Sequence, residues 1–253
     1  MRPLILVTND DGVMAKGLRA IAEALGLWGD VVVCAPQDNQ SATSHSLSLN
    51  RVLRLRTADS GFFAVDGTPA DSVFVALESG GRVLTRAPDL CVSGINHGLN
   101  LGVDVFYSGT VAAAREAALR GIPAFALSAD THADLADVAP FLAGFVASFW
   151  RARTDLRPTL FNINVPARGA PWSCRPTVLG RRTYEGGVEF RRDPRGSEYM
   201  WIGGGTPRHH DAPGSDTEAY DEGLIGVTPL SLDLTDLRGE DTVTALCGLI
   251  NGP

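Results

Sequence analysis

The fold of this chain is organised by one short segment, Leu4-Ile5-Leu6-Val7-Thr8-Asn9-Asp10-Asp11-Gly12, in which an apolar run ends in two adjacent carboxylates. Such a short, partly β-branched run predicts a strand that is buried on both faces, as in a parallel sheet. Open α/β sheets bind their ligands at the carboxyl ends of such strands. The couplet is therefore a candidate site for a hard cation with oxygen ligands. Because the same residues also form ordinary turns and helix caps, the couplet alone leaves both interpretations open.

Strands and helices alternate along the first 166 residues. After the acidic turn, apolar residues recur at helical spacing over 16–27, and a second buried strand follows over 31–35. The same patterns predict further strands over 89–93, 123–128 and 159–165, and further helices over 72–77, 111–119 and 135–149. The residues before the first of these helices, 67–71, resemble a helix start, with Pro69 just inside the first turn. This alternation predicts an α/β fold with a doubly wound, mostly parallel sheet and helices on both faces.

Residues 167–253 differ from this pattern, because helical periodicity fades and turn residues separate short alternating segments such as 187–192 and 199–203. We therefore expect a core over 1–166 and a β-rich extension with the C-terminal segment over 167–253. Five arginines of the extension suit an anionic substrate, a solvated surface or a subunit contact. These are Arg181, Arg182, Arg191, Arg192 and Arg195.

Composition narrows the class of protein. The 253 residues include 22 basic and 29 acidic side chains, and the net charge of -7 argues against a protein that holds nucleic acid by neutralising its phosphates. The four cysteines lie far apart and form no CxxC pair, which favours free thiols in a reducing cytosol. We see no signal-peptide pattern and no apolar stretch close to the roughly 18 residues of a membrane helix. The expectation is a soluble cytoplasmic protein with no membrane contact.

Several common phosphate-handling motifs are missing from the sequence. Lys16 is the sole lysine and is followed by Gly17, so there is no Walker A loop. Asp10 and Asp11 are adjacent, whereas aspartyl-phosphate phosphatases place their two aspartates in an Asp-x-Asp pattern. No Gly-x-Ser-x-Gly elbow marks a hydrolase serine.

A set of oxygen ligands remains. Asp10, Asp11 and the amide of Asn96 follow predicted strands, and the hydroxyl of Ser41 is a fourth candidate on the loop after the second strand. Oxygen ligands suit Mg²⁺ or Mn²⁺ better than Zn²⁺. The set therefore suggests metal-assisted hydrolysis of a phosphate monoester, in which the cation polarises a phosphoryl oxygen and lowers the pKa of an attacking water.

Ser108-Gly109-Thr110 stands at the first turn of the predicted helix over 111–119. Hydroxyls, free backbone N–H groups and the positive end of the helix dipole suit a phosphate there, although a plain helix cap explains the same residues. His45 and His97 lie beside the candidate ligands in sequence. Either could donate a proton to the leaving alcohol, and either could be a loop histidine that only packs or binds water.

The spaced motifs together resemble the SurE (survival protein E) family of nucleotidases. The resemblance covers nearly the whole chain, because several motifs occur in the family's order. They are Thr8-Asn9-Asp10-Asp11-Gly12, Ala35-Pro36 with Ser41, Gly67-Thr68-Pro69-Ala70-Asp71, Ser93-Gly94-Ile95-Asn96 through Asn100, Gly102 and Asp104, Tyr107-Ser108-Gly109-Thr110-Val111, Gly214-Ser215-Asp216-Thr217 and Val227-Thr228-Pro229-Leu230.

The resemblance implies a Rossmann-like core and a phosphatase that uses one divalent metal ion, Mg²⁺ or Mn²⁺, on nucleoside 5′- and often 3′-monophosphates, with short polyphosphate as a further substrate in some members. It places the metal ligands on Asp10, Asp11, Ser41 and Asn96, and the phosphate-contacting turn on residues 108–110. It also implies homodimers or homotetramers that exchange C-terminal segments, which would give the extension a part in assembly and in closing the site.

Two residues depart from the family pattern. Gln37 stands where an acidic residue commonly follows the proline, and Ala42 stands where glycine often follows the serine. Neither is a proposed ligand, so the departures bear on substrate preference and on the mobility of that loop. Two alternatives stay open at this point: a non-catalytic, metal-dependent nucleotide sensor, and a phosphatase for polyphosphate or another non-nucleotide ester.

Overall fold

The structure is a computed structural model and describes residues 2–152, 160–203, 205–210 and 212–251. Within these residues, nine strands form one sheet in the order β3-β4-β2-β1-β5-β6-β7-β13-β8. Their bounds are β1 Leu4–Thr8, β2 Asp30–Pro36, β3 Leu55–Thr57, β4 Phe63–Val65, β5 Leu90–His97, β6 Ala124–Ala129, β7 Leu160–Val165, β8 Cys174–Pro176 and β13 Ile225–Pro229. Thr159, which we expected to begin β7, lies outside the described residues.

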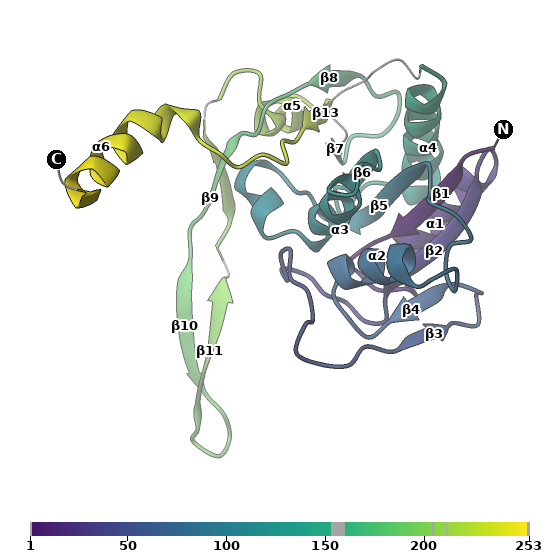
Figure 1. Ribbon diagram of the computed structural model, residues 1–253, viewed down its shortest axis with the longest axis horizontal. Coiled ribbons are helices and arrows are strands. Elements are labelled where there is room, and N and C mark those ends of the chain that lie inside the picture. The colour runs from purple at the N-terminus through teal and green to yellow at the C-terminus, as the bar shows by residue number, and fades with distance from the viewer. Residues whose placement is uncertain (1, 153–159, 204, 211, 252–253) are drawn as a thin grey trace.

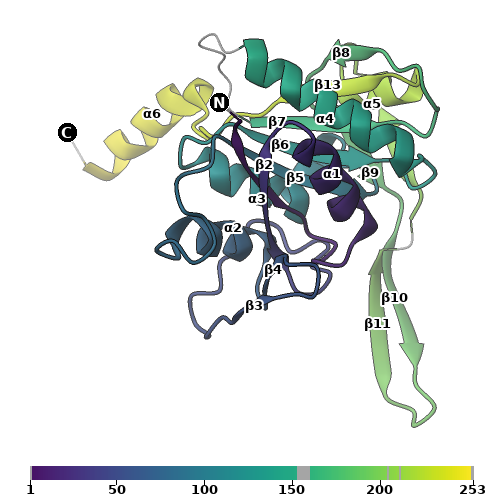
Figure 2. The ribbon, with the colours of Figure 1, turned by 90° about the vertical axis from the view of Figure 1, so that its right-hand side faces the viewer.

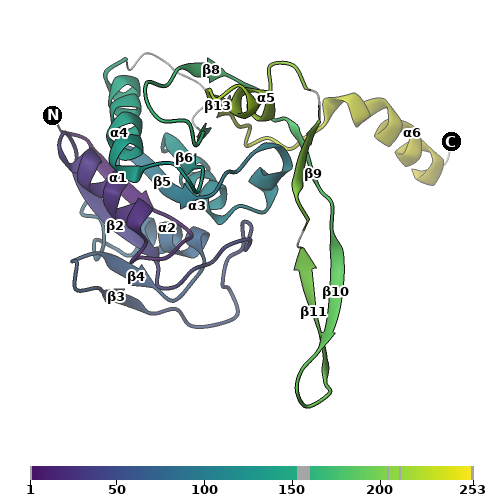
Figure 3. The ribbon, with the colours of Figure 1, turned by 180° about the vertical axis from the view of Figure 1, so that it is seen from behind.

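Helices cover both faces of this sheet, with α1 and α4 on one face and α2 and α3 on the other (Figures 1 and 3). Their bounds are α1 Lys16–Gly26, α2 Pro69–Glu78, α3 Gly109–Ala118 and α4 Leu135–Ala152. The strands β4, β2, β1, β5, β6 and β7 run parallel to one another, while β3 and β13 are antiparallel to the neighbours β4 and β7. The prediction of a doubly wound, mostly parallel sheet is confirmed.

Strand β1 is buried along its whole length. Ile5 and Val7 pack in the apolar cluster beneath α1 and α4, whereas Leu4 and Leu6 pack in the cluster beneath α2 and α3. Successive side chains of a strand point to opposite faces, so an unbroken apolar run can fill both. This explains why the opening segment lacks the polar alternation of a half-exposed strand.

Strand β5 is longer than we expected. The sequence predicted that the strand would end at Ser93 and that a glycine-rich loop would begin at Gly94. Instead β5 continues to His97, because its pairing with β6 shifts register after Ser93 and resumes at Asn96. Gly94 makes the shift feasible: its φ is +135°, and an added Cβ would lie 2.3 Å from the carbonyl oxygen of Leu127. Asn96 is thereby placed on a strand rather than on a loop.

The extension is divided between the main sheet and two projecting elements. Its strands β8 and β13 complete the main sheet, and β9 (Arg181–Tyr184) pairs with β12 (Pro207–His210). The segments expected to alternate form the antiparallel hairpin β10 (Gly187–Arg192) and β11 (Glu198–Gly203). This hairpin and α6 (Glu240–Asn251) project away from the body of the molecule, whereas α5 (Asp216–Asp221) lies beside β13 (Figures 1 and 2).

The expectation that no apolar segment approaches the length of a membrane helix was wrong. Helix α4 has 18 residues and a mean hydropathy of 1.2, so by length and composition it could span a membrane. In the fold, however, one stripe of α4 packs against α1 and the sheet, with Val138, Leu142 and Val146 fully buried. A core helix of a globular domain has the same apolar composition.

Candidate metal and phosphate site

The carboxyl ends of β1 and β5 lie side by side, and the two aspartates that follow β1 are held there in different ways. Asp10 is buried, and its Oδ1 accepts a short hydrogen bond from the hydroxyl of Thr110. Asp11 is partly exposed, and its Oδ2 accepts the backbone N–H of His97 at 3.1 Å. One carboxylate is therefore fixed by the start of α3 and the other by the end of β5.

Two neutral oxygens complete the set predicted from the sequence. The amide nitrogen of Asn96 donates to the carbonyl of Gly98 at 2.8 Å, which orients its Oδ1 away from that carbonyl and leaves it as an acceptor. Ser41 lies on the loop after β2, where its hydroxyl donates to Oδ1 of Asn39 at 2.7 Å. The backbone N–H of Gln40 donates to the carbonyl of Asp10 at 2.7 Å, so this loop is tied directly to the acidic couplet.

All four predicted ligands line one cavity of about 310 Å³, which we call the metal cavity. They come from three parts of the chain that follow, or end, three neighbouring strands: β2, β1 and β5. The geometry thus brings together the residues that the sequence separates by up to 86 positions, as in the contact between Asp11 and His97. Among the described residues, no three His, Cys, Asp or Glu side chains cluster in a way that could hold a metal, so a cation here needs Asn96 and Ser41 as well.

The electrostatics of the cavity suit a cation. Burial raises the pKa of Asp10 to about 6; the hydrogen bond from Thr110 opposes this shift, and the charge of Asp11 adds to it. Burial and the neighbouring carboxylate of Asp11 both disfavour the ionised form of Asp10, and a divalent ion bound between the two aspartates would reverse that effect. The donors are oxygens alone, the ligand type that Mg²⁺ and Mn²⁺ prefer. The residues present therefore fit such an ion.

The turn at the start of α3 has two parts with different contacts. Ser108 is the N-cap of α3, where its Oγ accepts the N–H of Val111 at 3.1 Å, and it also lines the metal cavity. Thr110 is fully buried, and its hydroxyl is used on Asp10. Gly109 lies between them, where an added Cβ would be 2.9 Å from Oδ2 of Asp10. The first turn of α3 is therefore in direct contact with Asp10. The backbone N–H groups of this turn have no carbonyl partners within the helix.

The two histidines considered as proton donors lie in different surroundings. His97 is exposed at the end of β5 and lines the metal cavity. His45 does not line this cavity; its Nε2 is 2.7 Å from Oε2 of the buried Glu116 on α3. Glu116 also pairs with Arg120 one turn further along the helix. The structure therefore brings His97, and not His45, to the predicted ligands.

Sequence reasoning missed the contacts that hold the extension against the site. Asp104, in the short helix η1 (Gly102–Phe106), accepts from Arg182 at 2.5 Å and from the hydroxyl of Tyr184 at 2.6 Å. Tyr184 itself lines the metal cavity. Of the five arginines named for the extension, Arg182 forms the pair with Asp104, whereas Arg191 pairs with Glu189 on the hairpin. No spacing in the sequence identified these pairs, because their members are about 80 residues apart.

A second missed feature is a buried amide network beneath the segment that follows β5. The backbone N–H of Asn100 donates to Oδ1 of Asn164 at 2.8 Å, and its side chain donates to Ser128 at 2.9 Å. Asn162 donates to the carbonyl of Asn100 at 2.8 Å. The signal was present in the sequence: two asparagines in the otherwise apolar strand β7 are unusual, because a buried amide needs hydrogen-bond partners.

Comparison with known proteins links this geometry to one family. Residues 5–186 match the family model described as "Survival protein SurE". The chain is 58% identical over 257 residues to "5'-nucleotidase SurE" of Sorangium cellulosum, covering 100% of this chain and 99% of the relative. It is 46% identical to "5'-nucleotidase SurE" of Geobacter sulfurreducens, covering 92% and 89%.

A solved structure agrees with these relatives. The chain resembles the structure titled "Crystal Structure of Sure Protein from Aquifex aeolicus" with a TM-score of 0.80 and 35% sequence identity. The likeness covers 96% of this chain and 99% of that one. Sequence and fold therefore point to the same family over nearly the full length.

Proposed function

The chain belongs to the SurE family, and from that premise we propose that it binds one Mg²⁺ or Mn²⁺ ion through Asp10, Asp11, Ser41 and Asn96 and hydrolyses nucleoside monophosphates at that ion. It is a 5′-nucleotidase that releases inorganic phosphate. The observation that supports the metal assignment best is the convergence of four oxygen donors on one cavity beside the first turn of α3.

In this proposal, different residues of the chain bind the metal ion and the phosphate. Asp10 and Asp11 would supply negative charge to the ion, and the hydrogen bond from Thr110 favours the ionised form of Asp10. A divalent ion held by these ligands would supply a Lewis acid that polarises a phosphoryl oxygen and lowers the pKa of a water molecule. Ser108 and the first-turn N–H groups of α3 hold phosphoryl oxygens, because the helix dipole favours an anion there.

We assign the proton donor to His97. Its imidazole is exposed at the edge of the metal cavity, so it can reach a leaving alcohol without displacing a ligand. His45 is the weaker candidate, because its Nε2 is already used by the buried Glu116. In this proposal His97 protonates the departing oxygen of the nucleoside.

The metal assignment is tested by phosphate release from AMP with Mn²⁺. We expect Asp10→Asn and Asn96→Ala each to lower turnover by about 100-fold or more, since several kcal/mol of charge stabilisation depends on the ion. Asp59→Asn, an exposed carboxylate remote from the cavity, serves as the matched control and should keep full turnover. Chelation should abolish turnover and added Mn²⁺ should restore it. Undiminished turnover in a folded Asp10→Asn variant would exclude the site.

We further propose that the enzyme acts as a homodimer or homotetramer through the extension. In the register of the hairpin, Val188 faces Ile202 and Phe190 faces Met200, so one face carries four apolar side chains, all of them exposed. Monomeric proteins rarely leave such a patch uncovered, and a lone two-stranded hairpin is marginally stable. A second copy of the chain supplies a matching face. A monomer in light scattering would contradict this assembly.

We place the enzyme in the cytoplasm. All four cysteines are free thiols in the structure, and two of them, Cys34 and Cys91, are fully buried. Burial raises the pKa of both thiols to about 12, so they behave as small apolar core residues. Thiol titration of freshly lysed cells would test this, because the proposal requires all four to stay reduced there.

A further inference from the structure

The short helix η1 joins the segment after β5 to the turn that we propose to hold phosphate, residues 108–110. The backbone carbonyl of Asp104 in η1 accepts the N–H of Tyr107 at 3.0 Å and the N–H of Ser108 at 2.9 Å. Ser108 is also the N-cap of α3. A displacement of η1 would therefore move Ser108, the side chain assigned to a phosphoryl oxygen.

The extension holds η1 through the side chain of Asp104. Its Oδ2 accepts from Nη1 of Arg182 at 2.5 Å, and its Oδ1 accepts from the hydroxyl of Tyr184 at 2.6 Å. Both donors lie on β9, which packs against η1. Only 11% of the Arg182 side chain and 10% of the Asp104 side chain are exposed, so salt and solvent screen their attraction little. Burial and the hydrogen bond to Asp104 raise the pKa of Tyr184 to about 12, which keeps its hydroxyl protonated and able to donate.

A second contact from the extension holds the first residue of η1. The buried carboxylate of Asp216 accepts the N–H of Gly102 at 2.9 Å and the N–H of Gly180 at 2.7 Å. The backbones of the two glycines are in contact, because φ of Gly102 is +54° and an added Cβ would lie 2.5 Å from the carbonyl oxygen of Gly180. Helix η1 is thus fixed to the extension at its first residue and again at Asp104.

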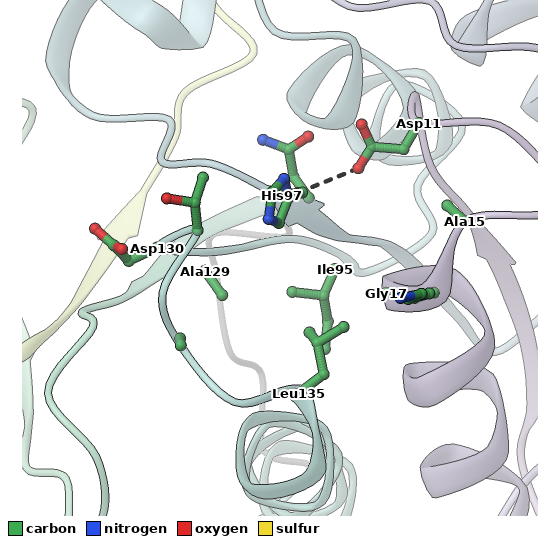
Figure 4. A pocket seen from close by; sticks show the side chains of 12 residues that line it. Asp11, Ala15, Gly17, Ile95, His97, Ala129, Asp130 and Leu135 are labelled. Atoms are coloured by element: carbon green, nitrogen blue, oxygen red, sulfur yellow. Dashed lines mark hydrogen bonds between the residues drawn. The ribbon is translucent and has the colours of Figure 1, made fainter.

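The charged metal ligands are held by contacts within the core. Oδ2 of Asp11 accepts the backbone N–H of His97, which joins the acidic couplet to the end of β5 (Figure 4). Asp10 accepts from Thr110 on α3. These contacts involve no residue of the extension, so the carboxylates of the metal site do not depend on Arg182.

The loop of Ser41 has one indirect link to η1. Ser44 of this loop donates from its hydroxyl to the carbonyl of Phe106 at 2.6 Å and from its N–H to the carbonyl of Tyr107 at 3.0 Å. The same loop is bound independently to the carbonyl of Asp10 through Gln40 and to α3 through His45. A shift of η1 should therefore disturb Ser108 more than it disturbs the metal ligands.

We propose that Arg182 and Tyr184 are positioning residues for the reaction: through Asp104 they hold η1 and so set Ser108 for a phosphoryl oxygen of the substrate. This inference rests on the proposed nucleotidase activity and gives the extension a specific part in it. Arg182 does not line the metal cavity, so its effect on bound phosphate has to pass through Asp104. Phosphate binding should depend on Arg182, and metal binding should not.

Arg182→Met tests this dependence in the full-length protein. We expect the Kd for inorganic phosphate, measured by calorimetric titration of the protein saturated with Mg²⁺, to rise about tenfold, the effect of one lost charge-assisted hydrogen bond. The Kd for Mg²⁺, titrated without phosphate, should change by less than about twofold, because the two carboxylate ligands share no partner with Arg182. A general loss of structure would change both constants.

Two further variants control for the loss of an ion pair. Arg182→Lys keeps a cation that can donate once to Asp104, as Nη1 of Arg182 does, and should bind phosphate within about threefold of wild type. Arg175→Met is the matched control, because Arg175 also belongs to the extension but pairs with Glu218 and Glu222 instead. It should lower Tm and leave the Kd for phosphate unchanged.

A double-mutant cycle separates positioning from direct contact with the substrate. Tyr184→Phe keeps the ring at the wall of the metal cavity and removes only the donor to Asp104, so we expect the Kd for phosphate to rise about threefold. In an Asp104→Ala background the hydroxyl has lost its acceptor, and Tyr184→Phe should have no further effect. Equal effects in both backgrounds would mean that the hydroxyl contacts phosphate itself, and would overturn the positioning role of Tyr184.

Unchanged phosphate affinity in a folded Arg182→Met variant would overturn the proposal, and so would equal losses in Arg182→Met and Arg175→Met. If Arg182→Met does not fold, the cycle with Tyr184→Phe decides the question. Phosphate release from AMP is measured separately. If wild type releases none but Arg182→Met still loses affinity for phosphate, the nucleotidase proposal fails and the positioning role stands. If wild type hydrolyses AMP and Arg182→Met binds phosphate normally, the positioning role fails alone.

Discussion

Strands β6 and β11 are both six residues long and both rich in apolar side chains, yet every residue of β6 is buried and every residue of β11 is exposed. β6 lies between β5 and β7, and helices cover both faces of that part of the sheet. β11 pairs with β10 alone among the described strands. The apolar side chains of β6 thus pack against other parts of the chain, whereas those of β11 stay exposed to solvent.

The contrast separates hydrolysis, which belongs to the core, from the assembly that we propose for the hairpin. The proposed metal ligands all belong to the part of the molecule built on the parallel sheet. The hairpin of β10 and β11 contributes no residue to the metal cavity. Substitutions in the core should therefore change hydrolysis and leave assembly intact, and substitutions on the hairpin should do the reverse.

Gly109→Ala should have the largest effect on the core side of this comparison. The new Cβ would lie 2.7 Å from Cβ of Asp10, so the acidic couplet must move. A displacement of about 1 Å at such a site lowers turnover about 100-fold. The rate of phosphate release from AMP measures this fall in turnover. Gly144→Ala, at an exposed helix position with no atom within 4 Å of the new Cβ, is the matched control and should keep wild-type activity. Equal activity of the two variants would show that Gly109 does not position Asp10.

Phe190→Asp should have the next largest effect, on the hairpin side. It puts a carboxylate on the face shared with Val188, Met200 and Ile202. If that face is buried between two copies, association should weaken about thirtyfold, as for a hot-spot residue worth about 2 kcal/mol. Sedimentation at several protein concentrations measures the change.

Arg191→Asp introduces the same side chain on the opposite face of the hairpin and should leave the assembly unchanged. Equal loss of association in both variants would mean that the two faces do not differ. A loss of Mn²⁺ binding in Phe190→Asp would contradict the separation of the two regions, because it would mean that the hairpin takes part in metal binding at the core.

We expect a smaller effect from loss of the hydrogen bond between His45 and Glu116, which holds the loop of Ser41 against α3. His45→Gln can still place an N–H near Oε2 of Glu116, whereas His45→Asn is too short. We expect the Kd for Mn²⁺ to rise about tenfold in the Asn variant, as when a group that supports a metal ligand is lost. The Gln variant should stay close to wild type. Calorimetric titration without substrate distinguishes them, and identical affinities would refute a positioning role.

The smallest effect concerns Ala42, which lies in the same loop with φ +59°. This left-handed conformation is unfavourable for alanine and costs glycine little, so Ala42→Gly should stabilise the fold by about 0.5 to 1 kcal/mol. This gain in stability corresponds to a rise in Tm of about 2 °C, which thermal unfolding measures. A fall in Tm would mean that the greater freedom of glycine in the unfolded chain outweighs the relief of strain.

Much of the fold was predictable from local patterns. The apolar run at Leu4 and the helical spacing after Lys16 marked β1 and α1 within a residue or two. Thr68-Pro69 marked the start of α2, where Thr68 and Asp71 form a capping box. The extent of β5 was not predictable in the same way. Gly94 breaks the local pattern, and pairing with β6 nevertheless restores the strand beyond it.

The candidate site was predictable in part, for a related reason. Carboxyl ends of parallel strands meet at one sheet edge, so Asp10, Asp11 and Asn96 could be grouped before the structure was known. The role of Thr110 could not be foreseen in this way. We expected it to contact phosphate, and the structure turns its hydroxyl to Asp10. Whether the three residues of that turn bind phosphate stays a prediction.

By itself, the sequence determined the alternation of strands and helices and the position of the acidic couplet at the end of the first strand, because periodicity, caps and turn residues act over a few residues. Only the tertiary structure decided that His45 meets Glu116, that Tyr184 closes one wall of the metal cavity, and that β13 joins the sheet antiparallel to β7. Those contacts join residues tens of positions apart. Their energy depends on how whole elements pack, which no local pattern records.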